Sequence, residues 1–270
     1  MTLDQLDYTE ILTSARKACR QGRDVLLDYY GRLSRVQEKD QAGLVTEADI
    51  ESEKVITEFL LKEYPNIDIL GEESFAKKNL DNKRPDKITQ QPCWILDPLD
   101  GTTNYVHQFP VFCISLGLMV DDEIVVAVVD APIMQQVFCA IKNQGSYLND
   151  KPINVSKRSE LKDSLLATGF FSQNKSLLTE QLDIFSRLIN HTRGVRRAGA
   201  AAYDLCMVAS GVFEGFWEQN LMPWDTAAGS LIVREAGGIV TDFKGEKYHP
   251  LQNSILAANP FIHEKIKQII

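Results

Sequence analysis

Two aspartates, Asp97 and Asp100, close the apolar segment that starts at Trp94 and reads Trp-Ile-Leu-Asp-Pro-Leu-Asp-Gly-Thr-Thr-Asn. The apolar residues predict a buried strand, and Pro98, which has no N–H to give to a sheet, predicts that the strand stops there. Two carboxylates held this close repel each other unless a cation or a proton lies between them. The Gly-Thr-Thr that follows frees backbone N–H groups, which bind anions, and supplies hydroxyls. The segment therefore suits a hard divalent cation beside a phosphate.

Three further acidic residues, Asp49, Glu72 and Asp225, stand in contexts that allow a structural or a chemical role. Asp49 follows Thr46 at the spacing of a helix capping box, and Asp225 follows Pro-Trp where an ordinary helix N-cap is expected. Glu72 follows Gly71 in a turn, where a solvated glutamate is the default. Spacing alone does not show whether these three meet the two aspartates, so the structural alternatives stay open.

The composition is that of an ordinary globular protein. The chain has 270 residues, of which 44% are hydrophobic and 24% charged, and its formal net charge is -8. Proteins that wrap nucleic acids carry basic stripes, whereas the basic clusters here are short, so a nucleic acid is not expected as the primary partner. No segment reaches the roughly 18 apolar residues of a membrane span, and no signal peptide is recognised at the N-terminus.

Cysteine usage favours a reducing compartment. The chain has five cysteines, at an odd count and without CxxC spacing. Most lie in apolar segments, which predicts buried free thiols and a cytoplasmic location.

Apolar periodicity predicts that residues 1–150 form an antiparallel α+β half. Residues spaced three and four apart predict one helix face, consisting of Ile11, Ala15, Ala18, Gly22, Val25 and Tyr29. This helix should end at Gly31, a second should run from 46–49 to about Tyr64, and 76–92 is expected to be an exposed loop. A tight hairpin is expected at Asp121-Asp122. Strands are expected at 67–70, 111–120, 123–130, 136–141 and 146–148.

The pattern of residues 151–270 predicts a smaller α/β half. Short apolar runs alternate there with helical stretches. The runs lie near Leu165, Val195, Phe213 and Ile239, and the helical stretches at 176–190, 200–210 and 226–236. A last strand is expected at 254–258, with Pro260 opening a short terminal helix.

Three motifs, taken in order, resemble the inositol monophosphatase family. They are Gly71-Glu-Glu-Ser, the segment from Trp94 to Asn104, and Trp224-Asp-Thr-Ala-Ala-Gly followed by Glu235-Ala-Gly-Gly. The resemblance runs from Lys39 to Asn259. It is strongest to the bacterial inositol-1-monophosphatase type, through Arg197-Ala-Gly-Ala-Ala-Ala and Val233-Arg-Glu-Ala-Gly-Gly-Ile.

The resemblance implies a layered αβαβα fold, usually assembled as a homodimer. It also implies hydrolysis of a small-molecule phosphate ester, myo-inositol monophosphate, with two or three Mg²⁺ per site and inhibition by Li⁺. The N-terminal half would carry most metal ligands, and the C-terminal half would carry Asp225 and the substrate-side residues.

The resemblance also implies roles for individual residues. The first Mg²⁺ would be held by Glu72, Asp97 and the Leu99 carbonyl. The second would be held by Asp97, Asp100 and Asp225. Catalysis would involve Asp49 and Thr102, which orient and help to deprotonate the attacking water, together with Glu72. Substrate binding would involve Asp100, the N–H groups of Gly101 and Thr102, and, along the alcohol, Gly199, Ala200, Ala201 and Glu218.

Glu218 is the residue from which substrate choice is inferred. An acidic acceptor near the leaving alcohol suits a polyol hydroxyl and disfavours a second phosphate, although an exposed glutamate at a strand end is the plain alternative. Fructose-1,6-bisphosphatase activity, histidinol-phosphatase activity and a non-catalytic regulatory role in a transcription complex stay open as alternatives.

Overall fold

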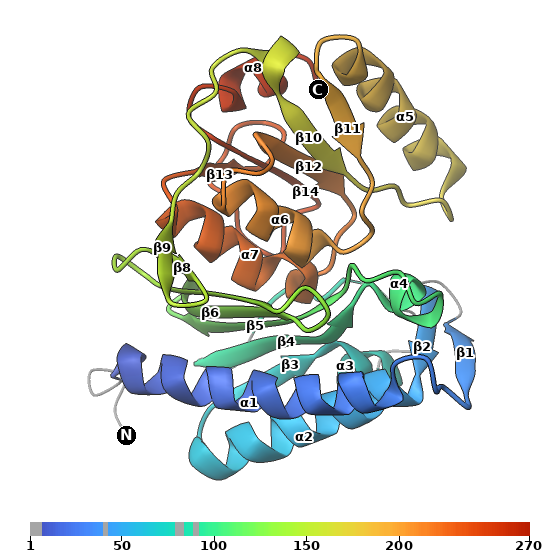
Figure 1. Cartoon of the computed structure of the whole chain (residues 1–270), viewed down its shortest axis with the longest axis vertical. Helices are drawn as coiled ribbons and strands as arrows, with labels where there is room; N and C mark the ends of the chain where they lie inside the picture. The colour runs from blue at the N-terminus through green and yellow to red at the C-terminus, as the bar shows by residue number, and fades with distance from the viewer. Residues whose placement is uncertain (1–6, 40–42, 79–83, 89–91) are drawn as a thin grey trace.

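The computed structural model describes residues 7–39, 43–78, 84–88 and 92–270. Its elements stack as helices, sheet, helices, sheet and helices, which is the αβαβα arrangement implied by the family resemblance (Figure 1). Within the described residues the α-helices are α1 (Tyr8–Tyr29), α2 (Glu47–Glu63), α3 (Glu72–Lys78), α4 (Thr102–Val106), α5 (Lys175–Ile189), α6 (Ala201–Ala209), α7 (Pro223–Glu235) and α8 (His263–Lys267). None of these helices combines the length and apolar character needed to cross a membrane.

The larger sheet has seven strands in the order β3-β4-β5-β6-β7-β8-β9, with α1 and α2 on one face and α6 and α7 on the other (Figure 1). Only β3 and β4 are parallel, and the other pairs are antiparallel. Its strands are β3 (Asp68–Gly71), β4 (Cys93–Asp100), β5 (Cys113–Val120), β6 (Glu123–Ala131), β7 (Gln136–Ile141), β8 (Ser146–Leu148) and β9 (Lys151–Ile153). A two-stranded ribbon, β1 (Val36–Lys39) with β2 (Gly43–Thr46), leads into α2.

The end of β4 corrects the prediction that this strand stops at Pro98. The strand runs on to Asp100, but its pairing with β5 shifts between Asp97, opposite Ser115, and Asp100, opposite Cys113. Pro98 lies inside this irregularity, so its missing N–H breaks no regular ladder hydrogen bond. Ser115 and Cys113 are two apart and share a face of β5. The extra residue in β4 therefore turns both aspartates to the same side of the sheet.

The first helix follows its predicted pattern. Ile11, Ala15, Ala18 and Gly22 are buried under the sheet, and the chain turns out of the helix at Gly31, whose φ is 73°. Gly22 lets α2 approach closely, because a Cβ there would lie 2.6 Å from the Ile56 Cδ1 atom. The hairpin at Asp121 and Asp122 also forms, with φ values of 49° and 61°.

The second sheet has five strands in the order β11-β10-β12-β14-β13 and lies between the layer of α6 and α7 and the outer helices α5 and α8 (Figure 1). Its strands are β10 (Leu165–Thr168), β11 (Gly194–Arg196), β12 (Gly215–Gln219), β13 (Ile239–Thr241) and β14 (Ser254–Ala258). β10 is parallel to β11 and β12, whereas β14 is antiparallel to both of its neighbours. A short 3₁₀ turn, Leu161–Asp163, precedes β10.

Three predicted boundaries in the C-terminal half move. The strand expected near Phe213 begins at Gly215, because the backbone N–H groups of Val212 and Phe213 still close the end of α6 on the Met207 carbonyl. α7 begins at Pro223 rather than at 226. The terminal helix begins at His263 rather than at Pro260, since the Asn259 side chain first holds a turn by accepting the Phe261 and Ile262 N–H groups.

In the loop expected at 76–92, α3 continues to Lys78 and 84–88 has no helix or strand, while 79–83 and 89–91 lie outside the described residues. The division near residue 150 stays a prediction. β9 pairs with β8, so the larger sheet itself extends to Ile153.

Candidate active site

A cavity of about 260 Å³ opens where β4 ends, between α4, α6 and α7. Almost all the candidate residues line it although they come from distant parts of the chain; they are Glu72, Asp97, Leu99, Asp100, Gly101, Thr102, Gly199, Ala200, Ala201, Glu218 and Asp225. Asp49 lies just behind this lining, where its Oδ1 atom is 3.0 Å from the Thr102 hydroxyl. The structure therefore brings the predicted set to one place.

Local hydrogen bonds hold the turn after β4. The Leu99 N–H donates to Asp97 Oδ1 over 2.9 Å, and the Ser52 hydroxyl of α2 donates to the Pro98 carbonyl over 3.1 Å. The Thr102 hydroxyl lies 3.1 Å from the Leu99 carbonyl oxygen as well as 3.0 Å from Asp49. The turn is thus tied both to itself and to α2.

Asp49 serves two neighbours through its two oxygens. Oδ2 accepts the Thr46 N–H over 2.9 Å in a capping box at the start of α2, as the structural alternative proposed. Oδ1 faces Thr102. The capping box fixes the carboxylate, so the two roles are compatible.

Glu72 begins α3, and the first turn of that helix is held by Glu53 of α2. The buried Glu53 carboxylate accepts the N–H groups of Glu73 and Ser74, each over 2.8 Å, and also the Ser74 hydroxyl. Gly71 leaves room for it, because a Cβ there would lie 2.8 Å from Glu53 Oε2. Glu53 was not among the residues predicted from the sequence, since a single acid inside a helix has no distinctive spacing.

Asp100 and Asp225 are each held by a helix. Asp100 Oδ2 accepts the Ala202 N–H of α6 over 2.7 Å, with the Cys113 thiol 3.7 Å away. Asp225 is not the N-cap of α7; it is the third residue of the helix, and its Oδ2 accepts the N–H of the N-cap Met222 over 2.7 Å.

Burial and mutual repulsion raise the pKa values of the central carboxylates. Burial, then the charges of Glu72, Asp100 and Asp225, raise the pKa of Asp97 well above its usual value. Burial raises the pKa of Asp100 to about 7, and burial together with Asp100 and Glu72 raises that of Asp225. Buried anions of this kind need a cation or protons.

The donor set fits a hard divalent cation, because carboxylates and a backbone carbonyl are oxygen ligands. Across the described residues no three acidic, histidine or cysteine side chains already form a metal-holding group. A cation held here would complete its shell with phosphate oxygens and water, which Mg²⁺ commonly retains.

Two glycines shape the backbone on the substrate side. Gly101 and Gly199 have φ values of 94° and 89°, a region that side chains disfavour. The Asn104 amide ties their loops together by donating to the Val111 carbonyl over 2.7 Å and to the Ala198 carbonyl over 2.8 Å. The rim of the cavity is therefore a hydrogen-bonded unit.

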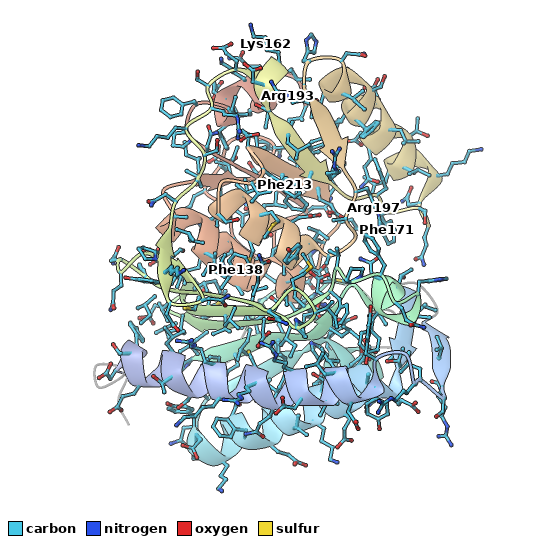
Figure 2. All side chains as sticks on the ribbon, viewed as in Figure 1. Phe138, Lys162, Phe171, Arg193, Arg197 and Phe213 are labelled. Atoms are coloured by element: carbon cyan, nitrogen blue, oxygen red, sulfur yellow. The ribbon has the colours of Figure 1, made fainter. Side chains whose placement is uncertain are left out.

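Several other lining residues were not predicted as site residues, namely Leu44, Thr103, Thr168, Gly169, Arg197, Asp204 and Leu221. Arg197, labelled in Figure 2, lies on the segment that joins β11 to α6. A signal existed for Asp204, since it follows Ala200 by four residues in the helix predicted at 200–210. That spacing places both on one helix face.

Comparison with known proteins identifies the family of the chain. The model of the Inositol monophosphatase family matches residues 7–270. An inositol-1-monophosphatase of Synechocystis sp. is 41% identical over 99% of this chain and 90% of its own length. A putative Nus factor SuhB of Neisseria meningitidis serogroup B is 40% identical, over 96% of this chain and 97% of its own.

A solved structure has the same fold. The crystal structure of the extragenic suppressor protein suhB from Bartonella henselae superposes with a TM-score of 0.87 at 35% identity, covering 96% of this chain and 98% of that one. The fold, the match over nearly the whole chain and the identity to these relatives agree, and the chain belongs to the inositol monophosphatase family, a family of metal-dependent phosphatases.

Proposed function

We propose that the protein is a Mg²⁺-dependent phosphomonoesterase that hydrolyses myo-inositol monophosphate to inositol and phosphate. The observation that carries the proposal is the set of buried carboxylates with raised pKa values, gathered in one cavity beside the Gly101-Thr102 turn. Buried carboxylates with raised pKa values are stabilised by a cation, and the backbone N–H groups of the turn can bind a phosphate.

The proposed ligands of two or three Mg²⁺ are Glu72, Asp97, the Leu99 carbonyl, Asp100 and Asp225. When bound, the ions would neutralise charge on the phosphoryl group and lower the pKa of a water molecule. The Thr102 hydroxyl, backed by Asp49 Oδ1 at 3.0 Å, would orient the attacking water and pass its proton to the carboxylate. Glu72 would assist in holding that water.

The rest of the cavity would hold the substrate. The N–H groups of Gly101 and Thr102 would donate to the phosphate, and Asp100 would contact the substrate through the oxygen that Ala202 does not use. The backbone of Gly199, Ala200 and Ala201 would lie along the alcohol, with Glu218 accepting a hydroxyl. Such fixed donors and acceptors stabilise charge as it develops.

The test is phosphate release from myo-inositol 1-phosphate with Mg²⁺, with EDTA and with added Li⁺. We expect Mg²⁺-dependent turnover that Li⁺ inhibits, and a loss of about 10²–10³-fold or more in Asp97→Asn, because that change removes a charge from the proposed shared ligand. Unchanged turnover in Asp97→Asn would contradict the proposed role of the cavity.

Arg197 favours one other substrate class. A cation among the lining residues suits a second phosphate, which makes fructose 1,6-bisphosphate the second candidate. A panel of kcat/KM values that also includes histidinol phosphate separates these candidates. A preference above about tenfold, or 1.4 kcal/mol, for the bisphosphate would reverse the ranking.

The name of the Neisseria relative favours a regulatory role as an addition. Association with transcription proteins that persists in Asp97→Asn would support it, and loss of any such complex would leave catalysis as the function. We further propose that the protein works as a homodimer in the cytoplasm; the five cysteines, all free and buried, fit a reducing compartment.

A further inference from the structure

Asp204 is a buried acid in the cavity for which the proposed chemistry has no use. It lies in the first turn of α6, the residue is 2% exposed, and it lines the cavity together with Glu218. Its Oδ1 atom is buried without any hydrogen-bond partner among the described residues. Buried polar atoms are nearly always paired, so this oxygen is available to a ligand.

Glu218 approaches the same space from β12. Its carboxylate occupies the position that a side chain at Gly169 would fill. Thr168, next to Gly169, holds the two strands together here, because its hydroxyl donates to the Trp217 carbonyl over 2.7 Å. The acid thus has its place because a glycine directly follows the neighbouring strand β10, and a binding group needs such support.

The two carboxyl groups influence each other and share a counter-charge. Burial raises the pKa of Asp204, and burial followed by the charge of Asp204 raises that of Glu218. Arg197 lowers the pKa of both. The exposed Arg197 guanidinium therefore offsets part of the negative charge of the two acids. Less of its positive charge is then left to attract a second phosphate.

We propose that Asp204 is a second hydroxyl-binding residue and that, with Glu218, it selects monophosphates of polyols carrying at least two free hydroxyls. This rests on the proposed phosphatase function and narrows its substrate class. Several hydroxyls, each a donor and an acceptor, can satisfy both acids. An alcohol without them leaves buried polar atoms unpaired, which is the situation that gives strong discrimination.

The experiment compares two esters that share the phosphate but differ in the alcohol: myo-inositol 1-phosphate and 4-nitrophenyl phosphate. Asp204→Ala should raise KM for the inositol ester about 10- to 100-fold, the range for a hydrogen bond to a charged group. Its kcat/KM for the nitrophenyl ester should stay within about threefold of the wild-type value, since the nitrophenyl group has no hydroxyl for Asp204 to bind. Asp204→Asn keeps the shape of the side chain and one acceptor oxygen. Its KM for the inositol ester should therefore lie between those of the wild type and Asp204→Ala.

Ser210→Ala is the matched control, since this residue caps the same helix and its hydroxyl lies 3.3 Å from the Met207 carbonyl. This substitution should leave KM and kcat/KM unchanged for both esters. Thermal melting checks that each variant is folded. If Asp204→Ala does not fold, the comparison of the two esters is made with Asp204→Asn.

Equal losses with both esters, or no loss with either, in a folded Asp204 variant would overturn the inference. A wild-type protein that prefers the inositol ester while Asp204 variants lose no selectivity sinks the inference alone. A wild-type protein that cleaves neither ester with Mg²⁺ sinks the proposed function.

Discussion

The Ser115 hydroxyl donates to the Trp224 carbonyl over 2.9 Å and so joins the middle of the larger sheet to the first turn of α7. Ser115 lies opposite Asp97 in the pairing of β4 with β5, and Trp224 precedes Asp225. One fully buried hydroxyl therefore connects the neighbours of two proposed metal ligands that are far apart in the sequence.

Ser115→Ala should weaken this connection without removing a ligand. The Trp224 carbonyl would lose a buried donor, which costs about 1–3 kcal/mol of unfolding free energy. The Mg²⁺ concentration for half-maximal activity should rise several-fold, while kcat at saturating Mg²⁺ falls little. Ser230→Ala is the control, because the Ser230 hydroxyl is equally buried in α7 but bonds only within that helix. If both variants have the same Mg²⁺ requirement, the connection has no role in metal binding.

Glu53→Gln tests whether the first turn of α3 positions Glu72. Glutamine keeps one acceptor oxygen but places an NH₂ where the carboxylate now meets backbone N–H groups. We expect a loss of about 1–3 kcal/mol of stability and a higher Mg²⁺ requirement. Urea unfolding and Mg²⁺ titration of activity measure the two effects.

The control for Glu53 is Glu51→Gln, since Glu51 lies in the same helix and, among the described residues, forms a surface pair with exposed Lys54 over 3.1 Å. Such a surface pair contributes little, so both measurements should match the wild type. A Glu53→Gln protein that is less stable but binds Mg²⁺ normally would show that Glu53 supports the fold and not the site.

Gly169→Ala should act on the substrate through Glu218. The added methyl would occupy the space of the Glu218 carboxylate, which has to move. Turnover of inositol 1-phosphate should fall about tenfold or more, roughly the value of one lost hydrogen bond, while 4-nitrophenyl phosphate is affected less. Gly145→Ala is not a suitable control because φ is 84° there, whereas Gly194→Ala, on β11 with ordinary φ, is suitable. Equal losses of turnover in the two glycine variants would show that Gly169 does not act through Glu218.

The sequence predicted those features that depend on local pattern. The face of α1, the hairpin at Asp121-Asp122 and the capping box at Asp49 each follow from a few neighbouring residues. The meeting of Glu72 with Asp97 depends instead on the parallel pairing of β3 with β4, across a polar segment without periodicity. Only the family resemblance anticipated that these two residues line one cavity, because no local rule connects residues so far apart.

The missed residues have a common physical cause. Glu53 and Asp204 are single acids on helices, and their effect comes from what the fold brings opposite them. The end of β4 was mispredicted for a related reason, since Pro98 normally stops a strand but is accommodated by an irregular pairing with β5. Three-dimensional context decided each of these positions.

The pH dependence of stability should report the uncompensated acids. Burial raises the pKa of Asp100 from 3.8 to about 7. An acid with a raised folded pKa binds its proton more tightly in the native state, so protonation stabilises the fold. Without metal, this contribution is present at low pH and is lost as the pH rises from about 4 to about 7. Tm in EDTA should therefore fall across that window.

Mg²⁺ should reverse this trend, because a cation competes with protons for the same carboxylates and binds better as they ionise. The rise in Tm caused by millimolar Mg²⁺ should thus increase from pH 5 to pH 8. Asp100→Asn should flatten both dependences, whereas Asp183→Asn, which alters an acid that is 69% exposed, should leave them unchanged. Calorimetry at four pH values with and without Mg²⁺ measures these slopes. An Mg²⁺ effect that is independent of pH would mean that the ion binds somewhere other than at these acids.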